Sequence, residues 1–411
     1  MRRCRRDVAG IVFAALAAAI RSAAPARAAD QPAPAGVAAP QEARARAWAT
    51  VFHGYAFLAS NRQGGDSGAQ DFESENHFMV IATRERGSGT WELLGTFTLE
   101  PMTVLPEGAP ELFQRGETYR GSLLVDRQHP HDLFVQLAAQ WSRPLAGRAR
   151  LRLYMAPVGE PALGPTAYVH RSSSAMDPVA PLSHHDQDST HISSDVATAA
   201  IELGLVTVEA SMFHGREPDE NRWDIDQGRP DSYAGRFSIR PAPGLVVQVS
   251  AGRREHPEAL EAADQTRQTA SVEYERTTPG GSIAASLIAG RNLLAGGQQE
   301  RGNTLEATWK FALTNTVYGR AERVDRDLYE LLNKEQRPDT VPSRRTAIDA
   351  LTVGYARDLP LLSEAGTSLG AGITFYRFDD RLDPAYGERP ISAQVFLRVG
   401  FGSRGMEHHH H

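Results

Sequence analysis

Hydrophobic and polar residues alternate one by one near the C-terminal end of the chain. In the segment Ile391–Phe401, one set of alternate positions is apolar and consists of Ala393, Val395, Leu397, Val399 and Phe401. The positions between them are mostly polar, namely Ser392, Gln394, Phe396 and Arg398. Successive side chains of a β-strand point to opposite faces. The segment therefore predicts a strand with one face towards an apolar environment and the other towards water.

The same alternation recurs along the chain and predicts sixteen strands. They cover residues 48–59, 75–85, 91–103, 132–143, 148–157, 190–202, 204–214, 231–240, 244–254, 266–276, 281–291, 302–312, 315–325, 346–358, 365–377 and 391–401. The alternation is clear in 302–312 and weaker in 75–85 and 190–202. Such a run of alternating segments is the signature of a membrane-spanning barrel, whose mean hydropathy is low because each strand is polar on one face.

The predicted connections alternate between short and long. The short ones are Glu85–Thr90, Pro144–Gly147, Leu203, Pro241–Pro243, Thr277–Gly280, Leu313–Thr314 and Leu359–Glu364. The long ones are Ser60–Ser74, Val104–His131, Val158–Ser189, Gly215–Pro230, Glu255–Gln265, Asn292–Arg301, Arg326–Arg345 and Phe378–Pro390. Outer-membrane barrels have short periplasmic turns and longer outer loops. We therefore predict an all-β fold, a transmembrane antiparallel up-and-down β-barrel of sixteen strands, with fourteen or eighteen as the alternatives.

The N-terminal residues have the pattern of an export signal. Four arginines precede the apolar stretch Ala9–Ile20, and Ala26-Arg27-Ala28 then provides a small-x-small cleavage site. We predict four parts of the chain: a signal peptide at 1–28, a flexible periplasmic arm at 29–47, an outer-membrane barrel at 48–401, and a tail at 402–411 that ends in four histidines and resembles a purification tag. The only cysteine is Cys4, so the exported chain would have no disulfide.

Composition and motifs exclude several functions. The formal net charge of −6 argues against nucleic acid as a partner. The chain has no GxSxG, HExxH or phosphate-binding loop motif, although Ser, His and Asp occur together within the short stretch Asp186–His191. Catalytic triads are assembled from distant chain positions, so this stretch is a weak candidate. We therefore predict that the protein is not an enzyme and requires no cofactor.

The barrel size predicts a water-filled interior. A barrel of about 16 strands leaves an aqueous channel, whereas about eight strands fill their interior with side chains. The charged residues expected to line the pore are Arg148, Arg150, Arg152, Arg236, Arg240, Arg320, Arg398, Glu273, Glu306 and Glu322. Opposed charges could set up a transverse field that selects ions, or they could pair across strands. The predicted function is a porin-like channel for small polar solutes or ions.

The third long loop, 158–189, is the candidate constriction of this channel. It begins with the turn-rich run Gly159–Pro165, and in general porins the third loop folds into the barrel, which by resemblance implies the same here. The fourth loop is densely charged, which predicts ion pairs and packing against the third. A closed barrel that serves as a structural or surface-binding protein is the competing hypothesis.

Histidines cluster in three successive long loops. They are His129, His131, His170, His184, His185, His191 and His214. Imidazole suits transition metals, so a site for Cu or Zn, and hence a metal-linked transport barrel, is one interpretation. Ordinary hydrogen bonding within polar loops is the other, because the spacing matches no strong metal motif. Asp186 and Asp188 could alternatively hold a hard divalent cation near lipopolysaccharide.

Several of these motifs carry a resemblance. HPHD at 129–132, GEPALGP at 159–165, HHDQDSTHIS at 184–193 and HGREPDENRWD at 214–224 resemble those of a family of uncharacterised proteobacterial outer-membrane β-barrel proteins. The closing strand resembles those of outer-membrane barrels, whose terminal Phe is recognised by the barrel-assembly machinery; Phe401 would play that role. The resemblance implies the outer membrane of a Gram-negative cell, contact with lipopolysaccharide, and a homotrimer by analogy with sixteen-stranded porins.

Overall fold

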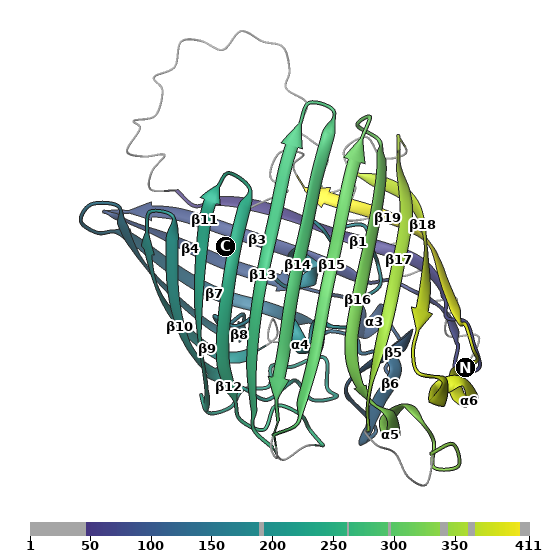
Figure 1. Ribbon diagram of the computed structural model, residues 1–411. Helices are drawn as coiled ribbons and strands as arrows, with labels where there is room; N and C mark the ends of the chain where they lie inside the picture. Colours follow the sequence, from purple (N-terminus) through teal and green to yellow (C-terminus); the bar gives the residue numbers. More distant parts are fainter. Residues whose placement is uncertain are drawn as a thin grey trace. The chain divides into compact units, whose positions relative to one another are not determined.

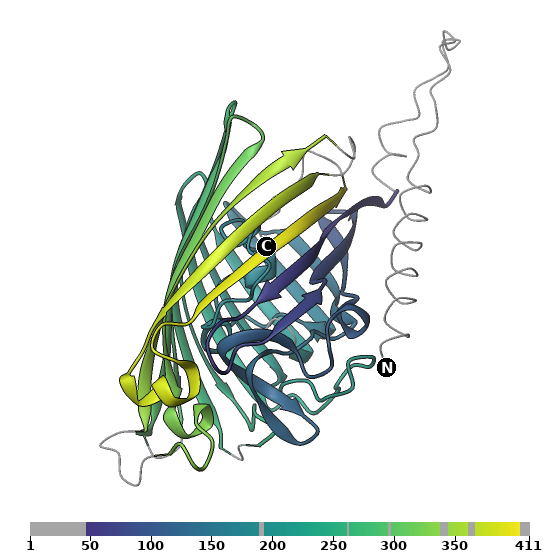
Figure 2. The same cartoon turned by 90° about the vertical axis from the view of Figure 1, so that its right-hand side faces the viewer.

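The chain forms a closed antiparallel β-barrel. The computed structural model describes residues 47–188, 193–260, 263–294, 297–337, 344–360 and 366–402. Consecutive wall strands pair with one another, and the barrel closes because β1 pairs with both β3 and β19 (Figure 1). In Figure 2 the first strands, in purple, lie beside the last, in yellow. The structure confirms the all-β barrel of sixteen strands.

The wall strands and the added elements are as follows. The wall consists of β1 (Ala49–Arg62), β3 (Asn76–Arg86), β4 (Gly89–Phe97), β7 (Phe134–Pro144), β8 (Ala149–Gly159), β9 (Ser193–Leu203), β10 (Val206–His214), β11 (Ser232–Ala242), β12 (Leu245–Arg254), β13 (Gln265–Thr278), β14 (Gly281–Leu293), β15 (Gln299–Phe311), β16 (Asn315–Asp327), β17 (Arg345–Leu359), β18 (Thr367–Arg377) and β19 (Ile391–Gly402). The connections contain β2 (Gln70–Glu73), α3 (Glu100–Thr103), β5 (Ala109–Tyr119), β6 (Ser122–Gln128), η1 (Tyr168–His170), α4 (His184–Gln187), α5 (Leu328–Leu331), η4 (Asp380–Leu382) and α6 (Asp383–Tyr386). Among the described residues, no helix has the length and apolar character needed to cross a bilayer.

Each predicted strand corresponds to a wall strand, with one clear difference in extent. The segment 91–103 was expected to be one strand, but β4 ends at Phe97 and the short helix α3 covers Glu100–Thr103. Pro101 stands in the first turn of this helix and has no N–H to donate to a strand partner. The predicted signal peptide, most of the arm 29–47 and most of the tail 402–411 lie outside the described residues.

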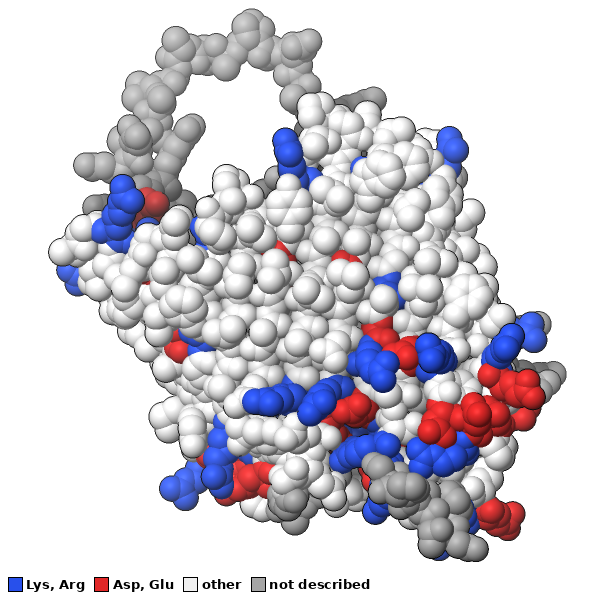
Figure 3. Space-filling model, viewed as in Figure 1, with Lys and Arg blue, Asp and Glu red and all other residues white. Residues whose placement is uncertain are grey.

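The outer face of the wall is apolar over most of its height. Large apolar side chains such as Leu287, Leu305, Trp309 and Val395 point outward and are exposed. Figure 3 shows a broad uncharged region, with Lys, Arg, Asp and Glu gathered towards the end that carries α5 and α6. This is the outer surface that lipid tails require, with charge confined mainly to one rim.

The two ends of the barrel differ in their connections. One end carries the short turns, for example Gly204 between β9 and β10, and is called the short-turn end. The other end carries the long loops and the elements α5, α6, β5 and β6 (Figure 1). At this long-loop end, Leu112 and Phe113 of β5 pack with Leu328 of α5 and Tyr386 of α6 in a buried apolar cluster. The hairpin β5–β6 therefore lies across the barrel mouth and does not extend away from it.

Candidate functional site

The connection between β8 and β9 lies inside the barrel. Its described part, residues 160–188, is here called loop 3. Tyr55 of β1 donates to the carbonyl oxygen of Val169 at 3.2 Å. On another part of the wall, Arg320 of β16 pairs with Asp177 at 3.2 Å. Because β16 is the eighth strand after β8 in a barrel of sixteen, loop 3 extends from its own strand to the opposite wall.

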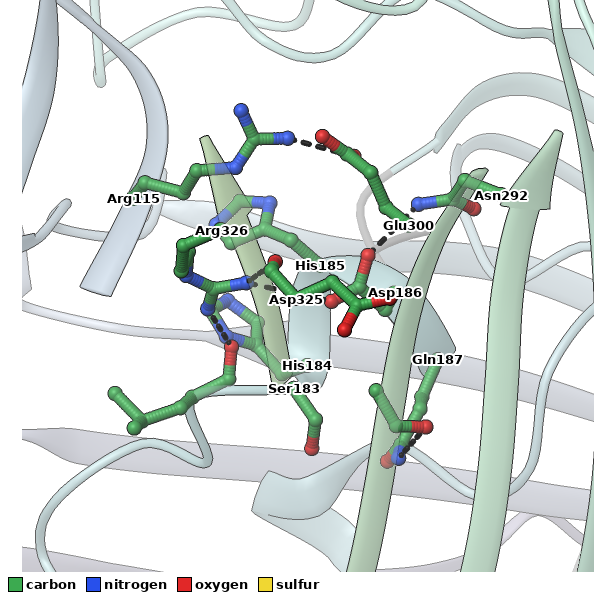
Figure 4. Close-up of polar contacts among 12 residues, drawn as sticks. Arg115, Ser183, His184, His185, Asp186, Gln187, Asn292, Glu300, Asp325 and Arg326 are labelled. Atoms are coloured by element: carbon green, nitrogen blue, oxygen red, sulfur yellow. Dashed lines mark hydrogen bonds and ion pairs between the residues drawn. The ribbon is translucent and has the colours of Figure 1, made fainter. Parts of the chain in front are cut away.

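A short helix fixes the end of loop 3 to the inner wall. In α4, Asp186 accepts from Asn292 of β14 at 3.0 Å and lies 3.6 Å from the Arg326 guanidinium of β16 (Figure 4). Gln187 donates to the carbonyl oxygen of Gly302 of β15 at 3.0 Å. Arg326 also donates to the carbonyl oxygen of Leu182 at 2.5 Å. These contacts hold α4 against three neighbouring strands.

A buried arginine anchors the middle of loop 3. Arg171 donates to Glu306 of β15 and to Asp188 at 2.7 Å each, and all three side chains are 1% exposed. Burial raises the pKa of Asp188, while Arg171 opposes that rise. By contrast, the side chains of Arg150 and Glu202 near the short-turn end are 41% and 35% exposed. The interior is thus filled at the level of loop 3 and hydrated towards the short-turn end.

The hydrated half carries part of the expected charge ladder. Arg152 of β8 and Arg236 of β11 both bind Glu209 of β10, at 2.7 and 2.6 Å. Arg150 donates to Ser142 at 3.0 Å, Arg240 donates to Thr207 at 3.2 Å, and Glu273 lies half-buried on β13. Arg148 lies in the exposed turn between β7 and β8, so the ladder starts at Arg150. Two of these arginines therefore pair with an acid across strands, and two others donate to hydroxyl groups.

The other expected pore-lining residues lie against loop 3 or against aromatic rings. Arg320 and Glu322 bind each other at 2.9 Å and are both buried. Glu306 is buried against Arg171. The Arg398 guanidinium lies 5.1 Å from the ring centre of Tyr55. These charged side chains position loop 3 and the wall, whereas those near the short-turn end face water.

Loop 2, which connects β4 and β7, covers the long-loop end. Arg115 of β5 binds Glu300 and Glu330 at 2.7 Å each. Glu117 of β5 pairs with Arg222 of the connection between β10 and β11, here called loop 4. Arg222 also lies 3.2 Å from Asp132 of loop 2. The fourth loop is ion-paired as expected, but its closest charge partners lie in loop 2 and on β12, where Arg254 binds Glu217 at 3.0 Å. Its charged contact with loop 3 is longer, with Glu217 lying 3.8 Å from His185.

The structure brings three of the seven candidate histidines together. Ligand atoms of His129, His184 and His185 all lie within 4.8 Å of one another. His131 is a neighbour whose ring centre lies 5.3 Å from that of His129, and it binds Glu100 at 2.8 Å. Two other candidates lie elsewhere, since His170 contacts His77 and His214 binds Asp231. The remaining candidate, His191, lies outside the described residues.

Sequence reasoning missed the acidic partners of this cluster. Glu117 lies 3.2 Å from His129 Nδ1, and Glu217 of loop 4 lies 3.8 Å from His185 Nδ1. Burial raises the pKa of Glu117, while the positive charge of Arg222 opposes that rise. Nothing in the residue pattern distinguishes these two glutamates from other loop acids, because their role depends on how three loops meet.

Comparison with known proteins shows the fold. No family model matches the chain, and no curated protein matches it in sequence. Among solved structures, an anion-selective porin from Comamonas acidovorans has a TM-score of 0.52 at 11% identity, covering 86% of this chain and 100% of that one. Salmonella typhi OmpF, in a complex with daunomycin, has a TM-score of 0.50 at 8% identity, with coverage of 86% and 97%. A loop-deletion mutant of Vibrio cholerae OmpT, an outer membrane protein, has a TM-score of 0.50 at 10% identity, covering 86% of this chain and 100% of that one. The chain therefore has the barrel fold of outer-membrane porins.

Proposed function

We propose that the protein is a porin-like channel for small polar solutes or ions, with loop 3 as its constriction. The observation that carries this proposal is the position of loop 3 inside a sixteen-stranded barrel. A barrel of about this size encloses more space than wall side chains alone can fill. Loop 3 occupies that space at one level, while the charged residues near the short-turn end remain hydrated. A permeating solute would enter this hydrated half and meet its main resistance at loop 3.

The ion pairs that hold loop 3 determine how narrow the channel is. Arg171 is bound to Glu306 on the wall and to Asp188 within the loop, in a buried setting. Removing one partner of a buried ion pair costs about 3–5 kcal/mol, because a charge is left without compensation. Loss of Arg171 would therefore loosen loop 3 while leaving the wall strands paired.

Single-channel conductance in a planar bilayer tests this proposal. We expect the wild-type protein without its histidine tail to conduct, and Arg171→Ala to conduct more, because the constriction is released. Arg323→Ala is the matched control, since Arg323 forms an exposed ion pair with Asp349 on the outer face. Conductance absent from both the wild type and Arg171→Ala would overturn the channel and favour a closed structural or surface-binding barrel. If both proteins conduct equally, loop 3 is not the constriction.

We further propose the setting in which the channel works. The apolar outer face and the charged rim suit the outer membrane of a Gram-negative bacterium, with the short-turn end in the periplasm. Lipopolysaccharide would contact the charged rim, and the barrel-assembly machinery would recognise the final strand. A proteobacterial origin, a non-enzymatic role and a homotrimer belong to the same proposal. Mass measurement of the detergent-solubilised protein tests the trimer directly.

A further inference from the structure

Three histidines from two loops meet at the start of α4, in the part of the barrel that loops 2 and 4 cover. His129 follows the hairpin β5–β6, whereas His184 and His185 are the first two residues of α4. They are 4%, 0% and 9% exposed. Their ring centres lie 4.1 Å apart for His184 and His185, and 5.2 Å apart for His129 and His185. We propose that these three residues bind one divalent transition metal ion, with Cu²⁺ or Zn²⁺ as the fitting ions.

The spacing suits a metal after a small side-chain adjustment. Zinc–nitrogen bonds of about 2.0–2.1 Å place two tetrahedral ligand atoms about 3.3 Å apart. The candidate ligand atoms already lie within 4.8 Å of one another. We expect rotation of the imidazole rings to close the remaining distance. Three histidines with an open fourth position form a known type of zinc site.

Each histidine also has an oxygen beside its Nδ1 atom. Glu117 lies 3.2 Å from Nδ1 of His129, the carbonyl oxygen of Pro181 lies 3.0 Å from Nδ1 of His184, and Glu217 lies 3.8 Å from Nδ1 of His185. Histidines that bind a metal almost always donate their other ring N–H to a carboxylate or a backbone carbonyl. In such an arrangement the Nε2 atom of each ring would be the metal ligand.

The local charge permits a cation in spite of nearby arginines. Arg222 is paired with Glu117 and Asp132, and Arg254 is paired with Glu217 at 3.0 Å. Arg267 donates to the carbonyl oxygen of His185. Nitrogen ligands favour Cu²⁺ or Zn²⁺ over Ca²⁺ and Mg²⁺, which prefer oxygen.

A bound metal would add a link between two loops that already touch. Loop 3 is fixed to β14, β15 and β16 through α4, and His129 belongs to loop 2, which packs on α5 and α6. Arg326 donates to the carbonyl oxygens of Phe113 in loop 2 and Leu182 in loop 3. Their only shared covalent path runs through β7 and β8. A metal would therefore cross-link the cover of the long-loop end to the constriction. This inference concerns metal binding and does not depend on whether the channel conducts.

Calorimetry and metal analysis on the full barrel, with the tail residues 406–411 removed, test the site. We expect one Cu²⁺ or Zn²⁺ ion per chain, and we expect His184→Gln/His185→Gln to weaken binding by about 100-fold or more. His214→Gln is the control, because His214 binds Asp231 outside the cluster. If the double variant does not fold, as judged by heat-dependent gel mobility, His129→Gln replaces it.

A second variant separates metal binding from a purely structural role. Glu217→Gln keeps the shape of the side chain but removes the charge near His185, and we expect a 10- to 100-fold weaker affinity, the usual effect of losing an outer partner of a ligand. Cobalt binding should also give a visible absorption spectrum that the histidine variants lose. No metal bound to the wild type, or equal binding by the wild type and the histidine variants, would overturn the site. Conductance is measured separately, so failure of either proposal is distinguishable from failure of the other.

Discussion

Gly290 of β14 and Gly302 of β15 are direct cross-strand partners, and both face the inside of the barrel against α4. A Cβ atom at residue 302 would lie 2.8 Å from Cβ of Ser183 and 2.9 Å from Cβ of Asp186. A Cβ atom at residue 290 would collide with the backbone carbonyl oxygen of Asp186. The two glycines therefore form a hollow in the wall in which the α4 backbone sits.

We predict that Gly290→Ala displaces α4 from the wall. The added methyl group meets backbone, which cannot move as a flexible side chain would, and such overpacking costs about 1–3 kcal/mol. Hydrogen exchange of the amides of residues 183–188 should become faster by the factor that is equivalent to this loss of free energy. The conductance should also rise.

The control for this prediction is Gly235→Ala on β11. A Cβ atom there would have only the carbonyl oxygen of Glu209 nearby, at 3.6 Å, which is an ordinary contact. This variant should retain wild-type exchange in residues 183–188. Unchanged exchange in Gly290→Ala would show that the hollow does not hold α4.

A second prediction concerns ion selectivity. Glu209 binds both Arg152 and Arg236, so Glu209→Gln would remove one negative charge and leave two arginines less compensated in the hydrated half. Selectivity should shift towards anions, because positive groups that line a lumen with low-dielectric walls attract anions. The reversal potential in a salt gradient measures this shift. Asp349→Asn on the outer face is the control, and a shift of Glu209→Gln towards cations would contradict the prediction.

The wall was predictable because its signal is local. Alternating positions such as Leu305 and Glu306 report directly which side chain meets lipid and which meets the interior. The connection lengths are local as well, because each one is counted between two successive strands of the sequence. The position of α3 was missed because the alternation continues into Glu100, while Pro101 already ends the ladder.

The interior of the barrel was less predictable because its contacts are remote in sequence. Arg171 and Glu306 are separated by 135 positions, and Asn292 and Asp186 by 106. The sequence marked the histidine-rich loops as a candidate site. It did not indicate which of the seven histidines would come together. His129 approaches His185 only because the hairpin β5–β6 folds back across the mouth. A local pattern cannot contain that information.

A third prediction concerns pH. Asp126 of β6 accepts hydrogen bonds from the Phe113 amide at 2.7 Å and from the Tyr386 hydroxyl at 3.0 Å. Burial raises the pKa of Asp126 from 3.8 to about 6. Between these values the docked hairpin binds a proton more tightly than the released hairpin, so docking should weaken as pH rises and level off above about pH 6.

Hydrogen exchange of the Phe113 amide, corrected for its intrinsic pH dependence, measures this docking between pH 4 and pH 7. The Asp126→Asn variant should lose the pH dependence, since its side chain does not titrate. Protection that increases with pH, or an equal slope in Asp126→Asn, would assign the dependence to another group.

A fourth prediction concerns lipopolysaccharide at the charged rim. Arg291 of β14 and Arg301 of β15 are direct cross-strand partners, and both are exposed on the outer face towards the long-loop end. Like charges directly opposite each other destabilise a sheet by about 0.2–1 kcal/mol, unless an anion bridges them. Arg291→Gln/Arg301→Gln should therefore be as stable as the wild type, or slightly more stable, in detergent without lipopolysaccharide. The same variant should gain less thermal stability than the wild type when lipopolysaccharide is added. The phosphate groups of lipopolysaccharide then have two fewer arginines to bind. Arg276→Gln, an exposed arginine of β13 near the short-turn end, should gain as much as the wild type. An equal gain in thermal stability in all three proteins would show that Arg291 and Arg301 do not bind lipopolysaccharide.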